Sequence, residues 1–217
     1  HICETKALWE EYVPRAYREQ TIRIERSADG QDRTWVNGVI REDLLPARAC
    51  VPNGMDDPDN PPTWSDITPG SHEGAARVAV LDEEGIERSL LFPSMYLLSG
   101  DIADVEVAAA ACHAYNEWIS DMCRDGSGRL DAVGLVPLQS VAAATKEVAH
   151  IAQLGLKGVL FRPERYNGLA LHDAALAPFW NAVADQGLFA AVHGSFGAHM
   201  PSFANSRYTD RFFTHMV

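Results

Sequence analysis

The sequence predicts an α/β protein built on parallel strands, because strand-like and helix-like stretches alternate from about residue 76 onward. The strand centres lie near Leu91, Gly134, Leu160 and Ala190, so successive centres are 43, 26 and 30 residues apart. Such spacings accommodate the crossover helix that neighbouring parallel strands require. The strands are continuous apolar runs, which is typical of strands covered by helices on both faces. A (β/α) barrel and an open doubly wound sheet both fit this pattern.

The first 75 residues precede this alternation and have a different character. Residues 9–12 predict a short helix that stops before a proline, and residues 21–36 predict a hairpin with its turn near Gly30. Residues 51–69 are rich in Pro, Asn, Asp and Gly, which predicts a long irregular loop. Because long loops often serve as lids or binding loops, we interpret this region as an insertion after the first strand.

The alternating part is punctuated by glycines, prolines and a helix-capping serine. A helix is predicted over residues 76–84 and stops at Gly85, and Ser140 is expected to cap a helix that runs to about residue 154. Further helices are predicted over residues 104–124 and 173–185. Strands are predicted over residues 86–92, 130–136, 157–161 and 188–192. No glycine-rich dinucleotide motif or P-loop follows any strand, which weakens the nucleotide-binding interpretation of an open sheet.

Charge and hydropathy exclude several kinds of partner. The chain has 18 Lys plus Arg against 30 Asp plus Glu, a net charge of −12 that repels phosphate backbones and excludes a nucleic-acid partner. No apolar run is long enough to span a bilayer, and the first residues lack the pattern of a signal peptide. The four cysteines, Cys3, Cys50, Cys112 and Cys123, contain no CxxC spacing and are interpreted as reduced thiols of a cytoplasmic protein.

His193 is the residue that points most directly to chemistry. It closes the apolar run over residues 188–192 and is followed at once by Gly194. In a barrel of parallel strands, side chains at the carboxyl ends point into a shared mouth where the chemistry takes place. Imidazole is also the commonest metal ligand and a proton carrier near neutral pH. The alternative is an ordinary loop histidine that hydrogen-bonds to nearby backbone.

Several segments match family motifs in order along almost the whole chain. They are LDEEGIERSLLFP (81–93), YNEW (115–118), RLDAVGLVPL (129–138), GLKGVLFRP (155–163), LHD (171–173), PFW (178–180) and the opening HICE with LW (1–4, 8–9). These segments resemble the amidohydrolase-related metal-dependent hydrolases and decarboxylases, in the branch that contains aminocarboxymuconate-semialdehyde decarboxylase. The resemblance implies a (β/α)8 TIM barrel, incomplete in this chain, with an insertion after the first strand. It also implies a metal-dependent hydrolase or non-oxidative decarboxylase that acts on a small carboxylate or carbonyl substrate.

The resemblance further implies one divalent metal ion at the carboxyl ends of the strands. His1 matches the second member of the family's ligand pair on the first strand, and His193 matches the single histidine ligand on the fifth strand. Two imidazoles and a carboxylate with an open position form a sound catalytic site for zinc, with manganese or iron as alternatives. The family's catalytic aspartate on the eighth strand has no counterpart before Val217.

Further residues are assigned roles with their structural alternatives. Glu4 either orients His1 or caps the following helix. Arg162 either grips a substrate carboxylate in a bidentate manner or forms an ion pair at the barrel rim. His193 and His215 are assigned as catalytic residues, and His215 could donate a proton to the substrate. The histidines that fall away from strand ends are assigned no chemistry: His72, His113, His150 and His172.

These assignments fit a single barrel domain over residues 1–217. Residues 1–75 would hold the end of the first strand and the insertion, and residues 76–217 would hold successive βα units. Strands for only about five of the eight barrel units are found, so we expect a chain truncated at both ends that is not an autonomous enzyme. We also expect a homo-oligomer. The competing hypothesis is a non-catalytic barrel that serves as a binding or assembly subunit. A carboxylate or histidine two residues before His1, and an aspartate after Val217, would decide between the two.

Overall fold

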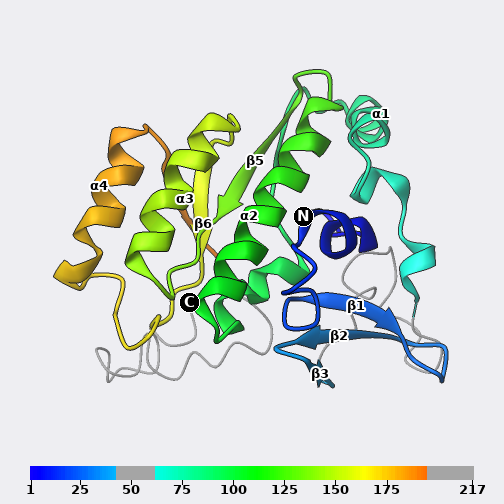
Figure 1. Ribbon diagram of the computed structural model, residues 1–217. Helices are drawn as coiled ribbons and strands as arrows, with labels where there is room; N and C mark the ends of the chain where they lie inside the picture. Colours follow the sequence, from blue (N-terminus) through cyan, green and yellow to red (C-terminus); the bar gives the residue numbers. More distant parts are fainter. Residues whose placement is uncertain (43–61, 195–217) are drawn as a thin grey trace, which may run out of the picture.

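The computed structural model describes residues 1–42 and 62–194 (Figure 1). The strands are β1 (Arg23–Arg26), β2 (Asp32–Val36), β3 (Val39–Arg41), β4 (Ser89–Leu91), β5 (Leu130–Leu135), β6 (Gly158–Phe161) and β7 (Phe189–Val192). The α-helices are α1 (Gly74–Glu84), α2 (Val105–Arg124), α3 (Val141–Gln153) and α4 (Ala177–Asp185). Short helical turns are η1 (Leu8–Tyr12), η3 (Trp64–Asp66), η4 (Pro69–Ser71), η5 (Met95–Asp101) and η6 (Ala174–Leu176).

Strands β4 to β7 form a parallel sheet whose spatial order follows the chain. In a doubly wound sheet the strand order reverses at a switch point, whereas in a barrel each strand lies beside the next one. In the described part of the chain the order is that of a barrel. The last of these strands has an open outer edge there, and its Phe189 and Val192 are 41% and 57% exposed.

The parallel sheet is strongly curled. The Ile2 amide donates to the Phe92 carbonyl at 2.9 Å, which places the first residues beside the end of β4. In a flat sheet with strands roughly 4.8 Å apart, this segment and β7 would be about 19 Å apart. Instead, the Nε2 atoms of His1 and His193 lie 3.1 Å apart. The described strands therefore form part of a barrel wall.

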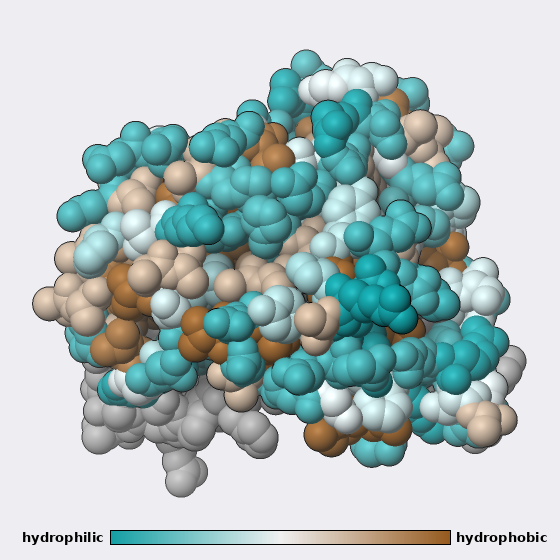
Figure 2. Space-filling model, viewed as in Figure 1, coloured by the Kyte–Doolittle hydropathy of each residue, from teal (hydrophilic) through white to brown (hydrophobic). Residues whose placement is uncertain are grey.

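The helices cover the outer side of this wall (Figure 1). Helix α2 packs on β5, α3 packs on β6 and α4, and α4 packs on β7. Two helix starts are capped by side chains: Asp104 Oδ1 accepts from the amides of Glu106 and Val107, and Ser140 Oγ accepts from the amide of Ala143. The buried residues of α2 and α3 face the sheet. Hydrophilic residues cover most of the outer face (Figure 2).

Buried Asn116 connects the helical layer to the sheet. Its Nδ2 donates to the Leu135 carbonyl at 2.9 Å, and its Oδ1 accepts from the Leu135 amide at 2.7 Å. Next to this clamp, Gly134 lies so close to α3 that an added Cβ would be 2.6 Å from Ile151 Cγ1. The YNEW segment therefore fixes the end of β5 against α2 through its asparagine.

The N-terminal region contains the predicted hairpin and one additional strand. Strands β1 and β2 pair antiparallel, and β3 joins them after a two-residue turn, Asn37-Gly38, with φ angles of +56° and +73°. Such an Asn-Gly pair with positive φ at both positions is typical of a type I′ hairpin. Our prediction stopped at residue 36 and missed β3, although this turn signal is present in the sequence.

Other elements follow the prediction with small shifts. Helix α1 ends at Gly85, whose φ of +69° is the predicted left-handed stop. The helix predicted over 173–185 is split into η6 and α4, with Pro178 in the first turn of α4. Turn η5 was not predicted. Of the loop predicted over 51–69, residues 51–61 lie outside the described part.

The interpretation of all cysteines as reduced thiols is wrong for Cys3, which is disulfide-bonded. The sequence contains no CxxC spacing, so local spacing gave no indication of this bond, which tertiary contact brings about. Cys112 and Cys123 carry thiols. No helix in the described part combines the length and apolar character needed to cross a bilayer.

Candidate metal centre

His1 and His193 meet at the carboxyl ends of the strands. Their Nε2 atoms are 3.1 Å apart, and their ring centroids are 4.9 Å apart. The Nδ1 atom of His1 lies 2.5 Å from the Pro93 carbonyl oxygen, and Nδ1 of His193 contacts the carbonyl of Gly194. A carbonyl oxygen can only accept, so each Nδ1 carries the proton. In the neutral imidazole, the lone pair is then on Nε2, and the Nε2 atoms of both rings face the same small volume.

This arrangement fits a divalent cation. Two neutral imidazoles that each carry the proton on Nδ1 have no hydrogen to share between their Nε2 atoms, so a cation would relieve their mutual repulsion. Metal–nitrogen bonds of about 2.1 Å at angles of roughly 90–110° place two ligand nitrogens about 3.0–3.4 Å apart. The observed 3.1 Å lies within that range. The Phe92 ring, with centroid distances of 6.1 Å to His1 and 6.4 Å to His193, forms an apolar wall beside them.

Glu4 supports this site through the backbone that follows β4. The carboxylate is fully buried, and it accepts hydrogen bonds from the amides of Ser94, Met95 and Tyr96 at 3.0, 3.0 and 3.1 Å. Burial raises the pKa of the Glu4 carboxyl above its usual range, and these hydrogen bonds oppose the rise. Glu4 therefore caps the start of η5 rather than the helix that follows Glu4 in the sequence. Because residue 93 supplies the carbonyl that holds His1, Glu4 fixes the segment on which the His1 ring depends.

Arg162 lies directly after β6 and is only 2% exposed. Its guanidinium donates to both carboxylate oxygens of Glu164, at 2.8 and 2.6 Å, and to Asp101. Arg41 also pairs with Asp101, at 2.8 Å. Two acidic groups thus hold two of the guanidinium nitrogens, while the buried third nitrogen, Nη1, has no hydrogen-bond partner in the described part. The structure contains the ion pair considered above, and the substrate-binding role of Arg162 stays a prediction.

The remaining predicted residues are placed as follows. His215 lies outside the described residues, so its catalytic role stays a prediction. His113 and His150, to which no chemistry was assigned, lie together on the helical layer with Glu117. The i, i+4 spacing of His113 and Glu117 on a predicted helix was the available signal. The supporting carbonyl of Pro93 was also missed, because its contact with His1 joins segments far apart in the sequence.

Comparisons with known proteins agree with this fold. An amidohydrolase family model matches residues 50–215. The chain is similar to an amidohydrolase from Mycobacterium avium subsp. paratuberculosis K-10, with a TM-score of 0.71 and 21% identity over 92% of this chain and 57% of the other. It is also similar to a 2,6-dihydroxybenzoate decarboxylase from Rhizobium, with a TM-score of 0.54 and 21% identity over 74% of this chain and 51% of the other. No curated protein sequence matches the chain.

At these identities the structural likeness concerns the fold, and it confirms the predicted fold class. The described strands and helices form part of an amidohydrolase TIM barrel. The chain covers 57% and 51% of the two solved proteins named above, so it spans about half their length.

Proposed function

Because this chain belongs to the amidohydrolase family, we propose that the protein is a metal-dependent hydrolase or non-oxidative decarboxylase whose ion binds His1 and His193. The single observation that carries this proposal is the 3.1 Å separation of the two Nε2 atoms, with both Nδ1 atoms turned to backbone carbonyls. Backbone or carboxylate partners of this kind orient the histidine ligands of metal sites. Imidazole ligands suit zinc, which we place ahead of manganese and iron.

Some residues of the site would bind the ion, and others would orient the residues that bind it. When bound, the ion would supply Lewis-acid polarisation of a substrate carboxylate or carbonyl group. His1 and His193 would hold it, the Pro93 carbonyl and Glu4 would keep the His1 ring in place, and Phe92 would exclude water from one side. Hydrolysis and decarboxylation require the same ligands, so both remain within the proposal.

We propose a small carboxylate or carbonyl compound as the substrate, with aromatic carboxylates as the first compounds to test. One solved decarboxylase of similar fold, with a TM-score of 0.55, is complexed with 2,6-dihydroxybenzoate. In this chain, Arg162 follows β6 while His193 follows β7, and the His193 amide donates to the Phe161 carbonyl at 3.1 Å. Arg162 therefore follows the strand that neighbours β7, the strand before a proposed metal ligand, and a guanidinium at this position could bind a substrate carboxylate. The cytoplasmic location, the homo-oligomer and the single domain over 1–217 stay predictions.

Metal analysis of the purified full-length protein, combined with a screen of aromatic carboxylates and lactones, tests the proposal. We expect a chelator to abolish turnover and added zinc or manganese to restore it. His1→Ala and His193→Ala should each lose the ion at the barrel mouth and the turnover, whereas His172→Ala, at a largely exposed histidine, should retain both. Metal stoichiometry and turnover that stay at the wild-type level in both site variants would refute the proposal. A full metal complement without any turnover across the screen would favour the non-catalytic binding or assembly subunit.

A further inference from the structure

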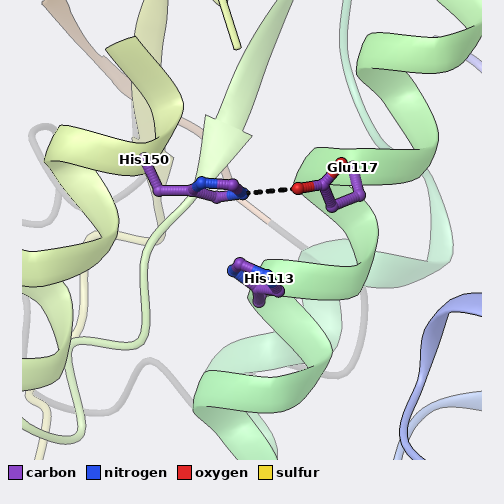
Figure 3. A group of neighbouring side chains, drawn as sticks. All are labelled: His113, Glu117 and His150. Carbon is purple, nitrogen blue, oxygen red and sulfur yellow. Dashed lines mark ion pairs between the residues drawn. The ribbon is translucent and has the colours of Figure 1, made fainter. Parts of the chain in front are cut away.

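A second group of ligand-type side chains lies on the helical layer, outside the barrel mouth. Figure 3 shows His113 and Glu117 on α2 and His150 on α3, with the His150 ring directed at the Glu117 carboxylate and the His113 ring next to that of His150. Residues four positions apart lie on the same face of a helix, which explains why His113 and Glu117 both reach α3. The rings of His113 and His150 are stacked with centroids 4.2 Å apart.

The distances in this group are close to those of a metal site. His150 Nε2 lies 3.0 Å from Glu117 Oε1, which is within ion-pair distance. This buried nitrogen makes no hydrogen bond in the described part of the chain. One ligand atom from each of the three residues lies within 4.8 Å of the other two. Coordination would require separations of about 3.0–3.4 Å, so the side chains must close by roughly 1.5 Å. The side chains of His113 and Glu117 are 52% and 37% exposed, which leaves them room for that rotation.

Glu147 of α3 orients one of these rings. Its Oε2 accepts from His113 Nδ1 at 3.3 Å, and its Oε1 accepts from the buried Asn116 Nδ2 at 2.8 Å. Because Asn116 is itself fixed to the backbone of β5, the Glu147 carboxylate has a fixed position. A carboxylate that accepts from one ring nitrogen leaves the other, Nε2, as a ligand atom with raised basicity. This is the usual support of a histidine ligand in a metal site.

The two histidines of the group border a cavity. A cavity of about 590 Å³ between α2, α3 and the N-terminal turn is lined by two of the three side chains, His113 and His150, together with Tyr12, Lys146, Glu147 and several alanines. The cavity provides an entry path and space for water, which would complete the coordination of an ion held by three protein ligands.

From these contacts we propose that His113, Glu117 and His150 form a second divalent-metal site, with zinc as the ion, that joins α2 to α3. Two imidazoles and one carboxylate are a donor set suited to zinc, and nickel or copper would bind the same set. The site lies on the outer helical layer, so its effect is to hold two helices together and stabilise the folded chain. An ion that binds the folded state and not the unfolded one raises the melting temperature.

Zinc titration of the metal-free, full-length protein tests this proposal. We expect two equivalents to bind the wild-type protein and one equivalent to bind His113→Ala/His150→Ala. In the His193→Ala background, zinc should still raise the melting temperature, and adding His150→Ala should remove that increase. Glu117→Gln, which preserves side-chain shape, should weaken zinc binding at the helical site at least tenfold, and His172→Ala serves as the matched histidine control.

The two sites can fail separately. If only the barrel-mouth site is wrong, the wild-type protein should bind one equivalent that is lost in His150→Ala and retained in His193→Ala. The helical site is overturned if zinc binding and the zinc-dependent melting temperature are the same in His113→Ala/His150→Ala as in the wild-type protein. If the double variant loses helicity, Glu117→Gln becomes the deciding variant. Unchanged zinc affinity of Glu117→Gln would then overturn the helical site.

Discussion

Replacing Glu4 by glutamine tests how the segment that follows β4 is held in place. The carboxylate accepts three backbone amides, two on Oε1 from Ser94 and Tyr96 and one on Oε2 from Met95. Glutamine has nearly the same shape but only one acceptor oxygen. If that oxygen keeps the two amides of Ser94 and Tyr96, the side-chain NH₂ faces the Met95 amide and leaves a buried donor unsatisfied.

The size of the effect follows from this count of amides. One buried, unsatisfied amide costs about 1–3 kcal/mol, so Glu4→Gln should lower the free energy of unfolding by that amount. Glu4→Ala removes the acceptor from all three amides and should cost about 3–5 kcal/mol, less than three full penalties because water can enter the space. Glu10→Gln is the matched control: Glu10 pairs with Lys6 at 2.8 Å on the exposed surface, and its loss should cost less than about 0.5 kcal/mol.

Urea unfolding of the three variants and the wild-type protein measures these costs. Loosening the segment that carries Pro93 should also weaken metal binding by His1 by about 10–100-fold, as loss of a ligand's supporting contact does. Equal stability of Glu4→Gln and Glu10→Gln would refute the assignment of Glu4 as the acceptor for this segment. A destabilised Glu4→Gln with unchanged metal affinity would limit its role to structure.

Packing, thiol burial and an ion pair give three further tests. Gly134→Ala should lower the free energy of unfolding by about 1–3 kcal/mol, because the new Cβ would lie 2.6 Å from Ile151 Cγ1; an unchanged urea midpoint would contradict this packing. Burial raises the pKa of the Cys123 thiol to about 12 and that of Cys112 well above its usual range, so at pH 8 both should resist alkylation until the protein unfolds. Rapid labelling of the native protein, followed by mass spectrometry, would disprove this. Arg162→Lys should lower kcat/KM of the proposed reaction by about one to two orders of magnitude, because lysine lacks the forked geometry; unchanged kinetics with a lower melting temperature would assign Arg162 to the ion pair alone.

The sequence predicted those elements whose ends carry local signals. The α2, α3 and α1 boundaries lie within two residues of the prediction, because Ser140 caps one helix and Gly85 ends another through contacts within one turn. The hairpin turn at Asn37 is a local signal of the same kind that was overlooked. Turn η5 was not predictable in this way, since its first amides are held by Glu4, about 90 residues earlier in the chain.

The candidate site could be predicted only in part. The strand-end position of His193 and the family resemblance were sufficient to select it together with His1. The carbonyl of Pro93 that fixes the His1 ring could not be predicted, because it is supplied by a contact between distant segments. The ion pair of Arg162 with Asp101 likewise joins residues 61 positions apart, and no local pattern indicates which acidic residue a buried arginine will meet.

The separation of the two barrel-mouth histidines along the chain has a consequence for folding order. His1 and His193 are 192 positions apart, so the loop that their contact closes contains every described helix and strand. Contacts between such distant residues form late, because the intervening chain must be ordered before they can be made. During synthesis, His1 is made before His193, and their contact can form only after β7 has been made and has paired with β6. Since metal binding is coupled to folding, uptake of an ion at this pair would report that the barrel wall from β4 to β7 has been completed.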